Sequence, residues 1–294
     1  MTLSGTNSYL IDCDNGNALI IDPGPWIDSH IEALLEAARS RGLTIVSIAI
    51  THGHPDHAPA TQPLAQATGA PVWAHPNSGA PHDRDLPLDG IFEVGNVALR
   101  VIDAPGHTFD HVVYYLPPER SLFTGDVILG EGTVVIAPPG GAMRPYQRTL
   151  QRLADEFAQA ITIYGGHGDR VDDAQGKIAE YIAHRQMRER ELIGALHGAP
   201  KTIPELVIAI YGSARPVLWP AMARQMLSYL MALESEGRVT AERVDRAMTP
   251  KESFILNPPL EQIVGSDQAA VMRAELGASL RLDDLFAYRL AEEL

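Results

Sequence analysis

The 294-residue sequence contains a single cysteine, Cys13, which excludes an internal disulfide and any metal site built from several thiolates. It also lacks a run of the roughly 18 consecutive apolar residues that a membrane-spanning helix needs. The first residues show no basic segment followed by a long apolar one, so no secretory signal is predicted. A content of 45% hydrophobic and 20% charged residues is typical of a globular protein. We therefore expect a cytoplasmic protein that does not enter a membrane.

Positive charge is scarce, and the net charge of −14 is unevenly distributed. Residues 1–172 carry 9 Lys and Arg against 20 Asp and Glu, a balance of −11. Residues 173–250 carry 10 Lys and Arg against 9 Asp and Glu, a balance of +1. Residues 251–294 carry 4 Lys and Arg against 8 Asp and Glu, a balance of −4. An acidic segment repels polyanions unless bound metal ions offset its charge. The first segment therefore favours a small substrate.

The first 170 residues alternate short apolar runs with loops rich in Gly, Pro, His and Asp. Their Val, Ile and Tyr content and their turn-residue boundaries predict strands at 7–12, 18–22, 45–51, 71–74, 97–103, 111–116, 121–124 and 161–164. Helical spacing of apolar residues predicts helices at 29–40, 58–67 and 144–158. Strands interleaved with helices indicate a layered α/β architecture.

The pattern changes after Gly168, where a long helix is predicted over residues 173–196. Further helices are expected at 203–210 and 217–236, followed by an extended pair at 238–244 and 253–256. Three helices and a hairpin in this order are typical of a winged-helix module. The tail is expected to be helical at 267–276 and 283–292. We therefore predict a first, layered α/β domain at 1–172, a winged-helix-like domain at 173–250 and a C-terminal extension at 251–294.

Four potential metal ligands follow the apolar run IVSIAI within six residues: His52, His54, Asp56 and His57. Imidazole nitrogens and carboxylate oxygens are the natural ligands of zinc and similar divalent ions. A loop can direct the first two side chains to one side and the last two to the other, which would place two metal ions side by side. The alternative is a polar loop that is rich in histidine by chance.

Three later loops each follow a predicted strand and carry one more potential ligand. His107 lies in Pro-Gly-His-Thr, Asp126 in Thr-Gly-Asp, and His167 in Gly-Gly-His-Gly. The glycines let the backbone approach the site closely and adopt a positive φ where a turn requires it. Each short motif is weak alone, but all three in this order after the histidine cluster form a specific signal.

Together these motifs resemble the metallo-β-lactamase superfamily over roughly residues 5–168. The resemblance implies a four-layer αββα sandwich with the metals at one edge of the two sheets. It implies that His52, His54 and His107 bind a first metal, that Asp56, His57 and His167 bind a second, and that Asp126 bridges both. Asp22 matches the family's first motif, whose usual role is to orient the ligand loops.

The implied mechanism is hydrolysis by a hydroxide shared between two divalent ions, with zinc favoured. Asp56 and Asp126 are the predicted catalytic residues, and no protein nucleophile is needed, so Cys13 is not expected to be one. His111 has either an orienting or a structural role. The remaining histidines are expected on the surface or in packing: His30, His75, His82, His184 and His197.

Two branches of the superfamily can be set aside by residue type. True β-lactamases of this fold carry Cys or Ser at the position of Asp126, and flavodiiron oxygen reductases carry Glu at the position of His54. RNase Z and glyoxalase II have the full set found here. The C-terminal motifs are similar to the β-lactamase-like protein 2 group, whose characterised animal form cleaves single-stranded RNA: YIAHR at 181–185, TIPELV at 202–207 and LESEGRV at 233–239. Gly-Thr-Asn at 5–7 belongs to the same resemblance.

The substrate stays open between a phosphodiester such as RNA, ranked slightly first, and a thioester or ester of the glyoxalase II kind. An alternative of another class is a nucleic-acid-binding regulator that uses the winged helix. Nucleic-acid-binding surfaces cluster Lys and Arg. The helix predicted at 217–236, which would be the recognition helix of the winged-helix module, offers only Arg224 as an exposed cation. A packing module, or a homodimer formed through the C-terminal region, is therefore favoured over nucleic-acid binding.

Overall fold

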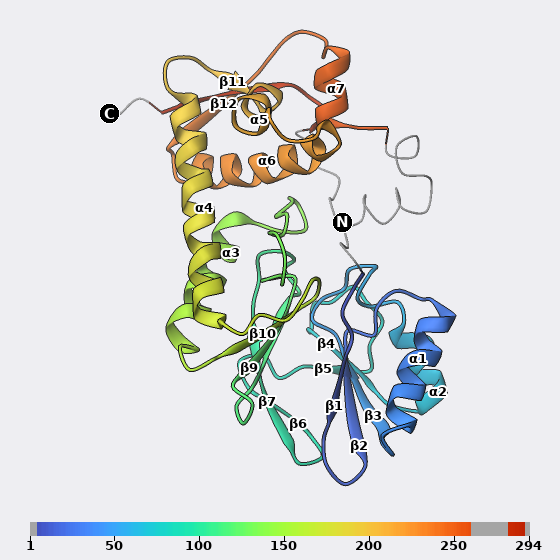
Figure 1. The fold of residues 1–294 in the computed structure, drawn as a ribbon. Helices are drawn as coiled ribbons and strands as arrows, with labels where there is room; N and C mark the ends of the chain where they lie inside the picture. The colour runs from blue at the N-terminus through green and yellow to red at the C-terminus, as the bar shows by residue number, and fades with distance from the viewer. Residues whose placement is uncertain (1–4, 260–281, 292–294) are drawn as a thin grey trace. The chain divides into compact units, whose positions relative to one another are not determined.

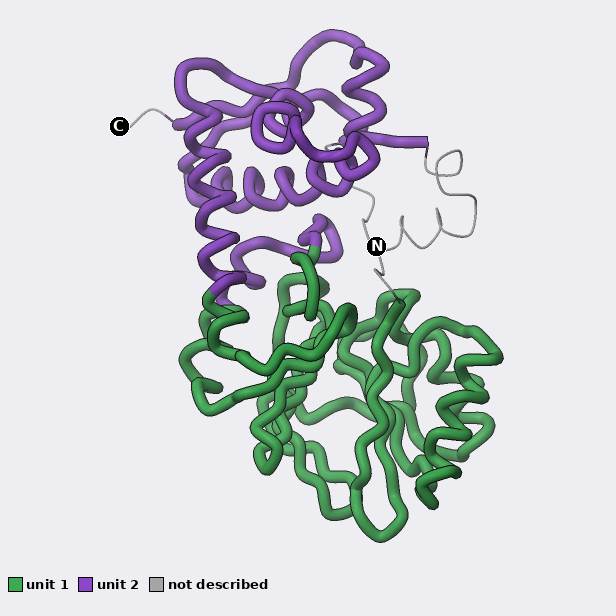
Figure 2. The backbone as a smooth tube through the Cα atoms, viewed as in Figure 1, with its two compact units in different colours: residues 1–134, 149–179 green, residues 135–148, 180–294 purple. Residues whose placement is uncertain are grey.

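The computed structural model describes residues 5–259 and 282–291. These divide into two compact units, which Figure 2 colours separately. Unit 1 comprises residues 1–134 and 149–179, and unit 2 comprises residues 135–148 and 180–294. Residues 135–148 thus group with the C-terminal part of the chain. The domain boundaries that the sequence predicts, at residues 172 and 250, stay a prediction.

The first sheet of unit 1 has five strands in the order β1-β2-β3-β4-β5. The β1–β2 pair is antiparallel, and the pairs from β2 to β5 are parallel. A short turn therefore joins β1 to β2, whereas helices connect β2 to β3 and β3 to β4. The strands are β1 (Tyr9–Asp12), β2 (Asn17–Ile21), β3 (Thr44–Ala49), β4 (Val72–Ala74) and β5 (Arg84–Asp85).

The second sheet of unit 1 also has five strands, in the order β10-β9-β8-β7-β6. Its strands are β6 (Ile91–Val94), β7 (Val97–Asp103), β8 (Val112–Leu116), β9 (Ser121–Gly125) and β10 (Thr162–Gly165). The β7–β8 and β8–β9 pairs are antiparallel and the β9–β10 pair is parallel. The carboxyl ends of β7, β9 and β10 therefore meet at one edge of the sheet. The loops that carry His107, Asp126 and His167 all leave from this edge.

Strand β2 shows why the sheets form layers, because its side chains alternate between two cores. Leu19 and Ile21 pack between the two sheets, against residues such as Val101 and Tyr114 of the second sheet. Ile20 points the other way, into a core shared with α1 (Asp28–Arg39) and α2 (Thr61–Thr68). Both helices cover the outer face of the first sheet (Figure 1).

The outer face of the second sheet is covered by the C-terminal part of α3 (Met143–Glu156) and the residues after it. The ring of Phe157 lies 5.2 Å from that of Tyr115 on β8, and the Arg100 guanidinium lies 4.9 Å from the same Phe157 ring. Helices thus cover both outer faces of the paired sheets. The predicted α/β sandwich is confirmed.

Unit 2 contains α4 (Ala174–Leu196) from Glu180 onward. It also contains α5 (Ile203–Tyr211), the 3₁₀ turn η1 (Pro216–Leu218), α6 (Trp219–Ser235) and α7 (Pro250–Leu256). Its small sheet has the order β11-β13-β12, with both pairs antiparallel. The strands are β11 (Lys201–Thr202), β12 (Val239–Arg243) and β13 (Phe286–Leu290). A strand near the end of the chain therefore lies between two earlier ones.

Two predicted elements of unit 2 are wrong. The extended segment at 253–256 belongs to helix α7, which begins with a capping box between Thr249 and Glu252 and has Pro250 in its first turn. The helix predicted at 283–292 is replaced over Phe286–Leu290 by β13, because pairing with β11 and β12 outweighs local helix propensity. The helix predicted at 267–276 lies outside the described residues.

Arg224 on α6 also differs from its prediction as an exposed cation. The residue is 7% exposed, and its Nη1 donates to the carbonyl oxygens of Pro220 and Leu256. The guanidinium therefore joins α6 to the end of α7 within unit 2. It does not provide a surface charge for nucleic acid.

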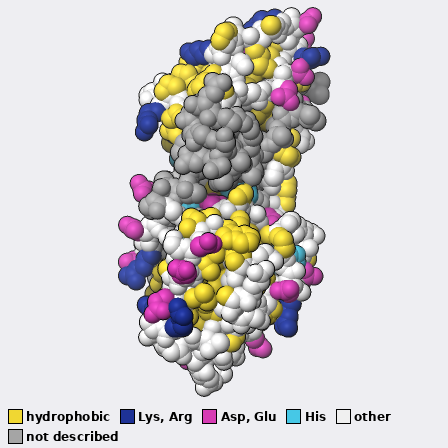
Figure 3. All heavy atoms as spheres, turned by 90° about the vertical axis from the view of Figure 1, so that its right-hand side faces the viewer, with side chains coloured by type: hydrophobic (Ala, Val, Ile, Leu, Met, Phe, Trp, Pro, Cys, Tyr) yellow, Lys and Arg dark blue, Asp and Glu magenta, His cyan; other side chains and the backbone are white. Residues whose placement is uncertain are grey.

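The surface of unit 1 agrees with its acidic composition. On the face drawn in Figure 3, the Lys and Arg side chains of this unit lie scattered among acidic and hydrophobic ones. Within residues 5–259 and 282–291, no helix combines the length and the apolar character that crossing a bilayer would require.

Candidate metal centre

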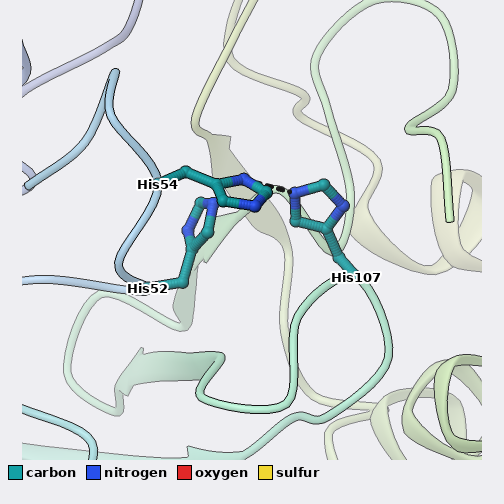
Figure 4. A group of neighbouring side chains, drawn as sticks. All are labelled: His52, His54 and His107. Carbon is teal, nitrogen blue, oxygen red and sulfur yellow. Dashed lines mark hydrogen bonds between the residues drawn. The ribbon is translucent and has the colours of Figure 1, made fainter. Parts of the chain in front are cut away.

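The first group of predicted ligands consists of His52, His54 and His107. The first two lie in the loop that follows β3, and the third lies in the loop after β7. Nδ1 of His54 and Nε2 of His107 are 3.1 Å apart, as the dashed line in Figure 4 marks. One ring nitrogen from each of the three side chains lies within 4.8 Å of the others. The three imidazoles are thus arranged as a set that could hold one ion.

The second group consists of Asp56, His57 and His167, all buried. Oδ2 of Asp56 lies 3.2 Å from Nε2 of His167 and 3.6 Å from Nε2 of His57. His167 comes from the loop after β10, on the other sheet from the loop that carries the first two residues. This group could hold a second ion.

Asp126 lies between the two groups, at the end of β9. Its Oδ2 is 3.7 Å from Nε2 of His107 in the first group. Its Oδ1 is 3.4 Å from Nε2 of His57 and 3.5 Å from Nε2 of His167 in the second. One oxygen of the carboxylate thus faces each group, and the bridging role that the resemblance implies for Asp126 stays a prediction. The structure brings all seven predicted ligands together.

Two glycines allow the second group and Asp126 to approach so closely. A Cβ added to Gly166 would overlap Oδ1 of Asp126 and would lie 2.7 Å from Cε1 of His57. Gly125 has a φ of +46°, and a Cβ there would lie 2.7 Å from Cβ of Thr51 and 2.8 Å from Nε2 of His111. Any larger residue at either position would displace ligand side chains or the groups that support them.

Asp22 orients ligands from both groups through one buried carboxylate. Its Oδ1 accepts from the backbone N–H of Thr51 at 2.6 Å, and its Oδ2 accepts from the Thr51 hydroxyl at 2.7 Å. Oδ2 also lies 2.9 Å from Nδ1 of His57, so that Nε2 of this ring faces Asp56 and Asp126. The Thr51 hydroxyl lies 3.1 Å from Nδ1 of His52. The expected orienting role of Asp22 therefore has a direct geometric basis.

We expect the Asp22→Asn variant to bind metal about 10- to 100-fold more weakly than the unmodified protein, because an outer partner of a ligating histidine is lost. Asparagine tolerates the φ of +51° at this position but presents an amide donor where a carboxylate oxygen accepts. Competition with a zinc-binding dye measures the affinity. The exposed Asp28→Asn change on α1 is the matched control, and equal affinities for the two variants would contradict the expected role.

His111 contacts two of the predicted ligands. Its ring stacks on that of His52 with centroids 4.6 Å apart, and its Nε2 accepts from the backbone N–H of Asp126 at 3.0 Å. These contacts favour the orienting alternative over a purely structural one. Of the other histidines, His30 contacts the Ser8 hydroxyl and His82 contacts Asp85, so neither joins the ligand groups.

Asp110 is a supporting residue that the sequence did not single out. Its Oδ2 accepts from the backbone N–H of Gly53 at 3.1 Å and from the Ser78 hydroxyl at 2.8 Å. It therefore fixes the turn between His52 and His54. The only signal in the sequence was its place in the GHTFDH stretch beside His107 and His111.

The histidines of the two groups differ in the direction in which their pKa values are shifted. Burial, followed by repulsion from His107, lowers the pKa of His54 to about 3, and burial with repulsion from neighbouring histidines holds the pKa of His52 well below its usual value. Burial also opposes charge on His57 and His167. For His57, the carboxylates of Asp22 and Asp126 prevail and raise the pKa well above its usual value. For His167, hydrogen bonds with Asp126 and Asp56 raise the pKa to about 10.

The donor set fits a divalent metal. Nε2 of His52 is buried and has no hydrogen-bond partner within the described part of the chain, although a buried ring nitrogen usually has one. The surrounding donors are imidazole nitrogens and carboxylate oxygens, which is the ligand chemistry of zinc and related ions. Metal coordination would satisfy the ring nitrogen of His52.

Curated relatives resemble this chain over most of its length. The lactamase-like protein adaB of Aspergillus niger is 31% identical over 279 residues, covering 88% of this chain and 83% of that protein. The beta-lactamase-like protein 2 homolog of Drosophila melanogaster is 30% identical over 275 residues, covering 88% and 90%. The atrochrysone carboxyl ACP thioesterase of Aspergillus chevalieri is 30% identical over 254 residues, covering 82% and 79%.

Solved structures and a family model agree with these relatives. A metallo-beta-lactamase family protein from Thermus thermophilus superposes with a TM-score of 0.65 at 25% identity, covering 81% of this chain and 91% of that one. The model of the metallo-beta-lactamase superfamily matches residues 1–167, which contain all seven predicted ligands. The chain belongs to the metallo-beta-lactamase superfamily and is a metal-dependent hydrolase.

Proposed function

We propose that the protein is a dinuclear hydrolase that cleaves thioesters or esters of small substrates carrying little negative charge. The observation that carries the dinuclear part is the position of Asp126, whose two carboxylate oxygens face two separate groups of three ligands. Two divalent ions, zinc being the favoured one, would supply an activated water at neutral pH and would polarise the carbonyl under attack. His52, His54 and His107 would hold one ion, and Asp56, His57 and His167 the other.

The protein's own carboxylates would stay ionised during this reaction. Although burial raises the pKa of Asp56, the hydrogen bond with His167 and the charge of His57 lower it to about 2. The pKa of Asp126 is likewise held well below its usual value against the effect of burial, first of all by His57. Both side chains can therefore accept hydrogen bonds from a water molecule at neutral pH and orient it for attack.

Net charge and sequence similarity favour a thioester or ester over RNA as the substrate. Residues 1–172 carry a balance of −11, which weakens the attraction of a polyanion even after two ions are bound. Arg224, the cation expected on the predicted recognition helix, is buried between α6 and α7. One relative that is 30% identical is named as a thioesterase. RNA cleavage is the second candidate, favoured by the similarity to beta-lactamase-like protein 2 homologs.

We also propose that unit 2 is a winged-helix-like module used for packing or self-association. The succession of α4, β11, α5, α6, β12 and β13, with β13 between β11 and β12, supports this assignment. The buried Arg224 argues against the alternative of a nucleic-acid-binding regulator. A mobility-shift assay with DNA and RNA tests this part, and tight binding that resists physiological salt would contradict it.

A substrate panel on the zinc-loaded full-length protein tests the proposed reaction. We expect hydrolysis of S-lactoylglutathione or an N-acetylcysteamine thioester, and much slower turnover of bis-p-nitrophenyl phosphate and fluorescent single-stranded RNA. A chelator should abolish the activity and added zinc should restore it. Preferential cleavage of the RNA would establish the second candidate, and turnover that survives complete metal removal would refute both.

The pKa shifts predict that the second ion is lost first on acidification. In the metal-free protein His57 and His167 hold protons at neutral pH because their pKa values are raised, and an incoming ion must displace these protons. Affinity for the second ion should therefore fall steadily from pH 8 to pH 5.5. The pKa values of His52 and His54 are lowered, that of His54 to about 3, so these two rings stay unprotonated over this range and affinity for the first ion should fall less steeply. Zinc titrations at several pH values measure both, and parallel loss of the two ions would contradict the prediction.

A further inference from the structure

The Gly5-Thr6-Asn7 segment lies directly against the loop that carries His167. The side-chain Nδ2 of Asn7 donates to the carbonyl oxygen of Gly165 at 3.0 Å and to that of Gly168 at 2.8 Å. The backbone N–H of Asn7 donates to the carbonyl oxygen of Gly166 at 2.7 Å. One asparagine thus binds the backbone on both sides of a predicted ligand.

The two preceding residues contact the ligand side chains themselves. The carbonyl oxygen of Gly5 accepts from Nδ1 of His167 at 2.9 Å. This bond places the proton on Nδ1 and turns Nε2 toward Oδ2 of Asp56, at 3.2 Å. The Thr6 hydroxyl donates to the same Oδ2 at 3.2 Å. The segment therefore orients two of the three ligands of the second group.

The loop needs such support because of its composition. Gly165, Gly166 and Gly168 surround His167, and Gly168 has a φ of +78°. Glycine gives the backbone the freedom to approach Asp126 and His57, but it also leaves the loop with many alternative conformations. The hydrogen bonds of Asn7 select one of them.

The first group is supported by different residues. His52 contacts Thr51 and His111, and Asp110 fixes the turn between His52 and His54. The hydrogen bonds of Thr6 and Asn7, by contrast, go to the second group or to its loop. Asp22 supports both ion positions through Thr51 and His57, whereas the side-chain contacts of Thr6 and Asn7 go to the second position alone.

We propose that the segment Gly5–Asn7 is a positioning element for the second metal ion, and that Asn7 and Thr6 set the affinity for that ion without affecting the first. The inference rests on the proposed dinuclear site. It predicts that variants of these residues yield a stable protein with one ion in place of two.

Zinc titration of the full-length metal-free protein tests the inference, with stoichiometry read by mass spectrometry of bound metal. We expect two ions in the unmodified protein. In Asn7→Asp, which keeps the side-chain size but loses both N–H donors, we expect an unchanged first ion and a second bound about 10- to 100-fold more weakly. Asn96→Asp, the same change at an exposed turn, is the matched control.

A second pair of variants isolates the hydroxyl of Thr6. Thr6→Val keeps the shape and removes the donor to Asp56, whereas Thr6→Ser keeps the donor. We expect weaker binding of the second ion in the first variant and recovery in the second, and a change in the Co²⁺ absorption spectrum at the second equivalent only. If Asn7→Asp does not fold, the Thr6→Val and Thr6→Ser variants still test the positioning role of the segment.

The outcomes separate the two proposals. A single ion in the unmodified protein would refute the dinuclear function itself. Two ions in the unmodified protein, with two equally tight ions in the Asn7→Asp and Thr6→Val variants, would overturn the positioning role alone. Equal weakening of both ions in a folded variant would also overturn it, because the segment would then support the whole site.

Discussion

We expect the Asp126→Ala variant to lose at least about 1,000-fold in kcat/KM, or roughly 4 kcal/mol of transition-state stabilisation, on whichever substrate the panel identifies. The reason is that one carboxylate faces both ligand groups, so its removal takes an anionic donor from each ion position at once. The side chain lies in a loop at the end of β9 and is not part of the hydrophobic core. The fold should therefore persist.

Circular dichroism and metal content complete this test. The far-ultraviolet spectrum of Asp126→Ala should match that of the unmodified protein, while bound metal should drop. Asp155→Ala, an exposed aspartate in α3, should leave both activity and metal content unchanged. Retention of more than a tenth of the activity by Asp126→Ala would show that the carboxylate does not bridge a reactive site.

The second large effect is expected from adding one methyl group, in the Gly166→Ala variant. The new Cβ would overlap Oδ1 of Asp126 and lie 2.7 Å from Cε1 of His57 and 3.2 Å from the backbone carbon of Gly125. Because backbone lies on one side of it, the ligand side chains would have to move. A displacement of about 1 Å at reacting groups costs on the order of 100-fold in rate, and we expect at least that loss.

Gly79→Ala is the control for this change, since nothing lies within 4 Å of a Cβ at that exposed position. Activity and zinc stoichiometry should be measured for both variants. We expect Gly166→Ala to retain the first ion, because His52, His54 and His107 lie outside the clash. Normal turnover by Gly166→Ala would mean that the second group is not part of the reaction site.

The sequence predicts the candidate site because its signals are local. Each predicted ligand follows an apolar run that ends at glycine or at a turn, and the carboxyl ends of β7, β9 and β10 share an edge. Because each of these ligands lies in the loop that follows its strand and the strand ends share an edge, His107, Asp126 and His167 lie close together. The continuous apolar run at residues 18–21 likewise agrees with a strand that the structure buries on both faces.

Unit 2 was harder to predict because its pairing is not local. Strand β12 pairs with β13 near the end of the chain rather than with the segment that follows it, and helix α7 lies between them. The capping box of Thr249 and Glu252 is a readable signal for α7 that apolar spacing alone does not show. The burial of Arg224 depends on carbonyl groups of α6 and α7 that no local pattern reveals.

The origin of the ligands in two different sheets has a mechanical consequence. His52, His54, Asp56 and His57 follow a strand of the first sheet, whereas His107, Asp126 and His167 follow strands of the second. Either ion, once bound, would cross-link the two sheets of the sandwich, as a disulfide cross-links two segments in other proteins. The chain has one cysteine, Cys13, and so cannot form a disulfide within itself. We therefore expect the protein to melt at a higher temperature with zinc than without it.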